Sequence, residues 1–107
     1  MLYKFKSRVA SDLIMLEPNG RQVLEILGKE PGLPGIIEAA DALAAVQVLE
    51  AAVVREEATR KAAIEEAAAK GEPLPRFEGV SLRQRVVPLI DMLHRSEKAG
   101  KEVVWGV

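Results

Sequence analysis

The sequence predicts an α+β fold: a small sheet that contains both terminal strands, with three helices packed on one face. Residues 2–7 alternate between apolar and polar side chains, and residues 103–107 are nearly all apolar, which are two patterns typical of β-strands. Most of the chain between them carries apolar residues at helical spacing. A terminal strand needs a partner for its backbone N–H and C=O groups. We therefore expect the two ends of the chain to pair with each other.

The length and composition indicate one domain over residues 1–107. The chain has no cysteine, which excludes disulfides and every thiolate-based metal site. Basic residues interrupt the first apolar positions, and no apolar run approaches the roughly 20 residues that span a bilayer. We expect a cytoplasmic protein with no membrane partner, and nothing in the sequence indicates a cofactor.

The net charge of −1 is unevenly distributed along the chain. Residues 38–79 sum to −4, from five basic and nine acidic groups, whereas residues 80–107 sum to +2, from five basic and three acidic groups. Neither region is charged strongly enough to indicate nucleic-acid binding. We do not expect a nucleic-acid partner.

The first third of the chain predicts a strand and then an ambiguous segment. In residues 2–7, Tyr3 and Phe5 fall on one face and are expected in the core. The apolar run 12–16 fits either a buried strand or the lead-in to a helix. Asn19-Gly20 fits either a hairpin turn or, with Gln22, a helical capping box. We favour a helix over residues 19–27.

The middle of the chain predicts a long helix over residues 41–69, capped by Asp41. Alanine fills 13 of the 31 positions from 39 to 69, and a short strand at 36–37 precedes them. After Arg55 the helix carries one large apolar residue, Ile64, so its second half should project into solvent. Three i,i+4 ion pairs are expected to support it: Glu56–Arg60, Glu57–Lys61 and Glu66–Lys70.

The last third predicts a second long helix over residues 81–99, after a turn-rich linker at 71–79. Ser81 and Gln84 form a capping box, and Pro88 should kink the helix. The two long helices should form an antiparallel pair. The expected contacts are Leu43, Val46, Leu49 and Val53 against Val86, Leu89, Ile90 and Leu93.

Five segments spread along the chain form a fairly specific series: Phe5-Lys6-Ser7, residues 12–16, residues 34–37, residues 80–89 and Val104-Trp105. In this order they resemble a family of small proteobacterial proteins, domain of unknown function 1840. The resemblance covers essentially the whole chain. It implies a bacterial cytoplasmic protein, and it implies no activity, cofactor or catalytic residue.

One cluster could carry chemistry. His94 is the single histidine, and Asp91 lies one helical turn before it, so a carboxylate could orient an imidazole base. A proline in a helix also frees a backbone group, here at Pro88. This cluster is the basis of an alternative function, a small-ligand binder or an enzyme. A solvated histidine is the competing interpretation, and the one that we favour.

Two further regions could contact a partner. Arg83 and Arg85 lie about 200° apart around the second long helix, so they form no basic stripe; Arg85 is expected in a structural salt bridge. The tail with Trp105 and Val107 could be captured by the sheet edge of another protein. The competing interpretation, which we favour, places the tail inside the sheet of this chain.

The sequence as a whole favours a non-catalytic interaction or regulatory module with a protein partner or a second copy of itself. The candidate interaction residues are Arg83, Asp91, His94, Trp105 and Val107. No catalytic, cofactor-binding or metal-ligating residues are predicted.

Overall fold

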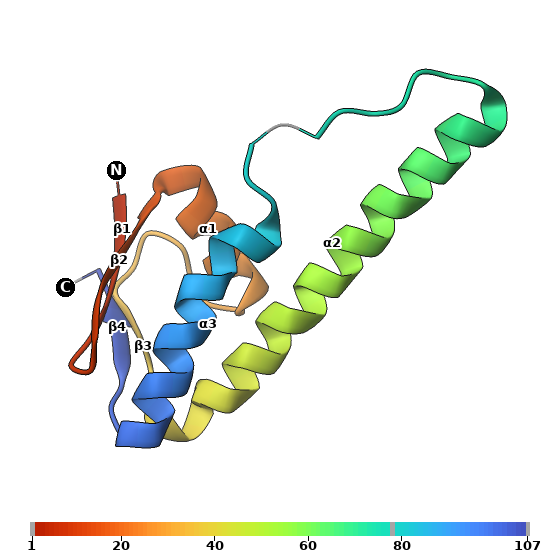
Figure 1. Ribbon diagram of the computed structural model, residues 1–107. Helices are drawn as coiled ribbons and strands as arrows, with labels where there is room; N and C mark the ends of the chain where they lie inside the picture. Colours follow the sequence, from red (N-terminus) through yellow and green to blue (C-terminus); the bar gives the residue numbers. More distant parts are fainter. Residues whose placement is uncertain (1, 78, 107) are drawn as a thin grey trace.

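The computed structural model describes residues 2–77 and 79–106, and within them it has two layers (Figure 1). The first layer is a four-stranded antiparallel sheet, and the second consists of three helices. The strands are β1 (Leu2–Ser7), β2 (Ala10–Leu16), β3 (Gly35–Ile37) and β4 (Val103–Trp105). The helices are α1 (Glu17–Ile26), α2 (Ala42–Lys70) and α3 (Leu82–Ala99), and a 3₁₀ turn at Ala39–Asp41 precedes α2.

The sheet has the order β2-β1-β4-β3, so both terminal strands are inner strands. Phe5 of β1 lies opposite Trp105 of β4, and β4 pairs on its other side with β3. The predicted pairing of the two chain ends is therefore confirmed. The sheet edges are β2 and β3.

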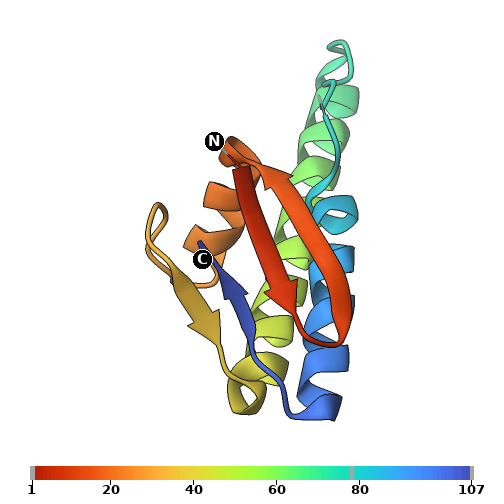
Figure 2. The same ribbon diagram turned by 90° about the vertical axis from the view of Figure 1, so that its left-hand side faces the viewer.

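All three helices cover the same face of the sheet, as Figure 2 shows with the sheet in front and the helices behind it. Tyr3 and Phe5 point into this layer and are buried, which confirms the predicted core face of β1. Trp105 is 1% exposed and belongs to β4, so the interpretation that places the tail in the sheet is correct for residues 103–105. The largest fully buried side chains besides these are Leu24, Leu49, Leu89, Leu93, Val23, Val86 and Val103.

Strand β2 runs directly into helix α1, which decides between the alternatives left open for residues 12–27. The helix starts at Glu17, and Asn19 is not its cap. Pro18 explains the earlier start, because its fixed φ and missing N–H suit the first helical turn. Gly20 is a helical residue, and the ring of Tyr3 packs against it where a side chain would otherwise stand.

Helices α2 and α3 form the predicted antiparallel pair (Figure 1), but part of the predicted contact is wrong. Leu43 is exposed, and Ala42 is the buried residue in the first turn of α2. At this end, the core side of α2 therefore lies one residue away from the predicted stripe, at Ala42 in place of Leu43. The other predicted α2 residues, Val46, Leu49 and Val53, are buried.

The two predicted helix starts have different outcomes. In α3, the Ser81 hydroxyl accepts from the Gln84 backbone N–H, and the Gln84 side chain accepts from Ser81 N–H, so the capping box is confirmed. Asp41 occupies the N-cap position of α2, but its side chain makes no capping hydrogen bond. The 3₁₀ turn before α2 gives Asp41 a helical backbone conformation in place of the extended one that capping requires. Helix α3 runs without a break through Pro88.

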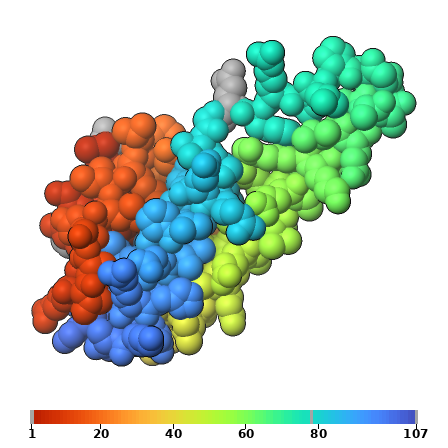
Figure 3. Space-filling view, in the orientation of Figure 1, coloured from red at the N-terminus to blue at the C-terminus, as the bar shows by residue number. Residues whose placement is uncertain are grey.

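The second half of α2 projects from the body, as predicted, and Figure 3 shows it extending beyond the two layers. We call residues 54–80, from the middle of α2 to the start of α3, the arm. Among the described residues of the arm, none is buried. The principal-axis extents of 52 × 28 × 22 Å reflect this projection.

Candidate functional site

The face of the sheet opposite the helices has no covering element among the described residues (Figure 2). Because side chains alternate along a strand, the residues next to the buried Tyr3 and Phe5 point to this side. Cross-strand register adds their neighbours, since Leu2 lies opposite Leu16, Lys4 opposite Ile14, and Lys6 opposite Val104. We call this surface the open face. Its residues are Leu2, Lys4, Lys6, Asp12, Ile14, Leu16, Ile36 and Val104.

The open face exposes large aliphatic side chains. Leu2 is 58% exposed, Ile14 54%, Leu16 63% and Ile36 42%. Leu2, Ile14 and Leu16 adjoin one another across β1 and β2, and Ile36 adjoins Val104 across β3 and β4. Lys4 and Lys6 of β1 lie between these two aliphatic groups. Contiguous apolar patches, unlike single exposed apolar residues, mark contact surfaces.

The sequences of three strands explain why this face is apolar. In β2, Leu13 and Met15 pack on the helix side, while Ile14 and Leu16 occupy the open side. The pairs Ile36-Ile37 in β3 and Val103-Val104 in β4 divide between the faces in the same way. Strands that are apolar on both faces are typical of sheets that are covered on both sides.

The sequence interpretation missed this surface. The signal was the uninterrupted run of residues 13–16, which fits burial on both faces of a strand better than the half-buried alternation of β1. The candidate interaction residues chosen from the sequence all lie elsewhere: on α3, in the core, or at Val107, which lies outside the described residues.

Arg83 binds Glu57 across the α2–α3 pair. Its Nε and Nη2 atoms both donate to the carboxylate at 2.8 Å. The hydrogen bond from Arg83 lowers the pKa of Glu57 below its usual value, and the same carboxylate raises the pKa of Arg83. The predicted Glu57–Lys61 pair is therefore wrong, whereas Glu56–Arg60 and Glu66–Lys70 are confirmed at 3.1 and 2.8 Å.

The side chain of Arg85 meets no carboxylate within the described residues, so the predicted salt bridge is wrong. It donates instead to the Gln22 side chain at 2.5 Å and to the Val80 carbonyl at 3.1 Å. Both acceptors are neutral groups, an amide of α1 and a backbone carbonyl. Arg85 thus links α1, α3 and the end of the arm.

Asp91 and His94 both lie on the exposed side of α3. The Asp91 carboxylate pairs with Arg95 at 3.1 Å, and within the described residues no hydrogen bond or ion pair joins Asp91 to His94. Asp91 and His94 are therefore close in the sequence, but their side chains do not form the expected pair. Pro88, also exposed, lies on the same helix.

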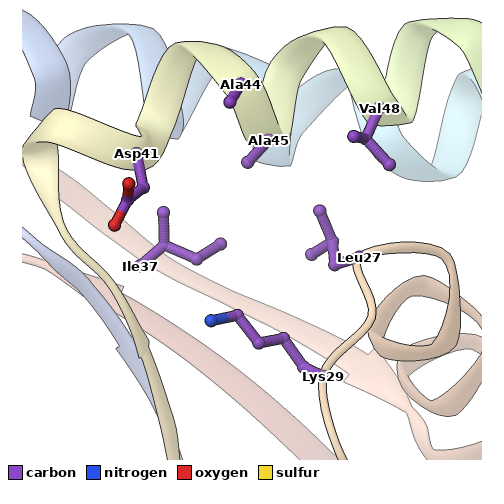
Figure 4. Close-up of a pocket in the computed structure, with 7 residues that line it drawn as sticks. All are labelled: Leu27, Lys29, Ile37, Asp41, Ala44, Ala45 and Val48. Atoms are coloured by element: carbon purple, nitrogen blue, oxygen red, sulfur yellow. The ribbon is translucent and has the colours of Figure 1, made fainter.

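A shallow pocket lies between the start of α2, strand β3 and the segment after α1 (Figure 4). Its volume is about 210 Å³, and its walls are mostly aliphatic. Lys29 and Asp41 supply its only charged groups (Figure 4). Ligand sites are generally larger, at about 300–1,000 Å³. The other lining residues are Leu27, Ile37, Ala44, Ala45 and Val48.

Metal-binding clusters and membrane-spanning helices are both absent from residues 2–77 and 79–106. No group of three or more metal-binding side chains occurs among them. None of their helices is both long and apolar enough to span a membrane.

Comparison with known proteins identifies the family. The family model described as Domain of unknown function (DUF1840) matches residues 1–105. The chain belongs to this family. The match confirms the resemblance seen in the sequence, and the family description specifies no activity. Neither the curated proteins nor the solved structures contain a match.

Proposed function

We propose that this member of the DUF1840 family is a non-catalytic interaction module that binds a protein partner through the open face. The observation that carries the proposal is the exposure of Leu2, Ile14, Leu16 and Ile36, of which the last three lie on strands that are apolar on both sides. Burying them against a partner would remove apolar surface from water at about 25 cal/mol per Å². The cysteine-free sequence supports a reducing, cytoplasmic location for this module.

The alternative function near Pro88, Asp91 and His94 gains no supporting contact. Asp91 is engaged by Arg95, and all three residues are exposed on one helix. A general base needs a partner that orients it, which is the role that Asp91 was expected to perform.

Site-specific photo-crosslinking in the native cells tests the proposal. A photoreactive amino acid at Ile14 or Leu16 should give a discrete protein adduct on irradiation. The matched control is the same amino acid at Ala51, an exposed residue of α2 far from the open face. A crosslink between two copies of the chain would identify the partner as a second copy. If neither open-face position gave an adduct above the Ala51 control, the proposal would be wrong.

A further inference from the structure

The charges on the open face specify the chemistry of its partner. Lys4 and Lys6 project from β1, an inner strand. Lys4 lies opposite Ile14 of β2, and Lys6 lies opposite Val104 of β4, so each lysine has an aliphatic neighbour on one side. Asp12 is the single acidic residue of this face. Neither lysine forms an ion pair within the described residues. The open face therefore offers two ammonium groups between the aliphatic residues of β2 and those of β4 and β3.

The size of the open face fits a segment of a protein better than a whole domain. Four strands about 4.8 Å apart span about 14 Å, and six residues of β1 span about 20 Å. A helix is about 10 Å wide, and about 14 of its residues span 20 Å. One amphipathic helix of this length would cover most of the face.

The spacing of the lysines also fits a helix. Alternate residues of a strand are about 7 Å apart, so the Cα atoms of Lys4 and Lys6 are separated by about this distance, and both side chains start from the same face. Helical residues three or four apart have Cβ atoms about 5–6 Å apart. Two carboxylates at such positions can each reach one lysine, while aliphatic residues on the flanks contact Ile14 and Val104.

A hollow beside the lysines provides a place for a partner side chain. Strand β4 ends at Trp105, and Gly106 turns away with a φ of 76°, so β1 extends beyond its neighbour. The resulting depression has a volume of about 300 Å³. Its lining residues include Leu2, Lys4, Lys6, Leu33 and Pro34.

Self-association through this face is disfavoured by the same charges. A two-fold contact between two open faces would bring the lysines of both copies into one apolar interface. Like charges in such a contact oppose binding, and one Asp12 per copy cannot neutralise two lysines.

We infer that the partner on the open face is an acidic amphipathic helix of another protein, with carboxylates on Lys4 and Lys6 and aliphatic side chains against Leu2, Ile14, Leu16 and Val104. This inference rests on the proposed function, because it assigns the partner of the same surface.

Peptide selection tests this inference directly, because a random library contains every candidate pattern of charges and aliphatic residues. A library of 16-residue peptides is displayed and selected on the immobilised full-length protein. The enriched peptides should combine aliphatic residues with two carboxylates three or four positions apart. Their affinity, measured by fluorescence anisotropy, should fall about tenfold or more for the Lys4→Glu/Lys6→Glu variant. The Lys4→Gln/Lys6→Gln variant should give a smaller loss.

The matched control is Lys29→Glu/Lys98→Glu, which makes the same charge change at exposed residues outside the open face. It should leave the affinity within about twofold. Circular dichroism of each variant verifies that the fold is intact. Enrichment of neutral or basic peptides, no enrichment, or equal losses in both charge-reversal variants would overturn the inference.

Sedimentation with anionic vesicles tests whether the open face binds a lipid surface in place of a protein helix. The wild-type protein should not sediment with phosphatidylglycerol vesicles. Sedimentation that Lys4→Glu/Lys6→Glu abolishes would assign the face to a membrane and overturn the inference. Photo-crosslinking at Leu16 in the Lys4→Glu/Lys6→Glu variant distinguishes this inference from the proposed function. If charge reversal did not reduce the protein adducts, the open face would still bind a protein, but the partner would not be an acidic helix.

Discussion

The ring of Phe5 contacts the ring of Trp105, with the two centroids 5.7 Å apart and the planes tilted by 49°. The two residues lie opposite each other in β1 and β4, so this contact joins the first and last strands of the chain on the core side of the sheet. Tilted aromatic pairs contribute about 0.5–1.5 kcal/mol beyond the area that they bury.

Substitution of Trp105 should therefore destabilise the fold strongly. Trp105→Ala removes a fully buried indole and is expected to lower the free energy of unfolding by about 3–5 kcal/mol. Urea denaturation followed by circular dichroism measures the loss.

Truncation after Glu102 removes β4 altogether and leaves β1 and β3 without their common partner, so the truncated chain should be unfolded. A folded, soluble truncated protein would contradict this account.

Gly20→Ala should lower the stability of the fold, although alanine has a higher helix propensity than glycine. Alanine in a helix interior is normally more stable than glycine by about 1 kcal/mol. At position 20, however, an added Cβ would overlap Cδ2 and Cγ of the Tyr3 ring. Gly20→Ala should therefore destabilise the protein by about 1–3 kcal/mol, measured by chemical denaturation. In a Tyr3→Leu background, which lacks the ring, the penalty should shrink; an unchanged penalty would exclude this explanation.

The hydroxyl groups of Ser7 and Ser96 should be energetically coupled. Ser96 is buried and donates to the Met92 carbonyl at 2.7 Å, so its oxygen accepts from Ser7, also at 2.7 Å. This chain of hydrogen bonds joins β1 to α3. Ser96→Ala should cost about 1 kcal/mol. A double-mutant cycle with Ser7→Ala should give a coupling energy of at least about 0.5 kcal/mol. Strict additivity would show that the hydrogen bond contributes nothing.

The Arg83–Glu57 pair should make stability depend on pH in a defined direction. Arg83 holds the pKa of Glu57 below its ordinary value of 4.5 in the folded state. The pair therefore stabilises the fold above pH 4.5, and this contribution is lost as the pH falls through the lowered pKa. The urea midpoint of wild type should exceed that of Glu57→Gln at pH 7, and the two should converge in acid.

The control for this pair is Glu66→Gln, which removes an ion pair within the arm only. Its urea midpoint should stay close to that of wild type at both pH values, because the pair with Lys70 joins two residues of the same helix. A high salt concentration should also reduce the difference made by Glu57→Gln, since both partners are exposed. A midpoint difference that persisted in acid would assign the effect to something other than the charge of Glu57.

Shortening the arm should leave the rest of the fold intact. None of its described residues is buried, and Glu56 lies next to the start of α3, where its carboxylate accepts from Leu82 N–H at 3.2 Å. A short Gly-Ser loop can therefore replace residues 60–78. The melting temperature should change by only a few degrees, while the Cα radius of gyration should fall below 15.9 Å. Small-angle scattering and calorimetry measure the two quantities; unfolding would show that the arm supports the body.

The elements with strong local signals were predictable from the sequence. The alternation of Tyr3 and Phe5, the capping box at Ser81 and the alanine-rich composition of α2 each depend on residues close together in the chain. The start of α1 was predicted two residues late because the capping pattern at Asn19 competes with the preference of Pro18 for a first turn. The sequence pattern by itself does not show which of these two signals sets the start of the helix.

The candidate site depended on information that local patterns do not contain. The sequence marked Arg83, Asp91 and His94 by residue type, but the chemistry of a side chain depends on what packs beside it. Arg83 forms an ion pair with Glu57, which is 26 residues away in the chain, and Asp91 pairs with Arg95 in place of His94. The open face became visible only once the strand order placed Ile14, Lys4 and Ile36 on one surface.

The sequence by itself determined the class of the fold, the strands at both ends and the projection of the second half of α2, because periodicity and helix propensity act over a few residues. The tertiary structure decided which face of the sheet the helices cover and therefore which aliphatic residues remain exposed. That choice rests on contacts between distant segments, such as Phe5 with Trp105 and Tyr3 with Gly20, whose partners no local pattern specifies.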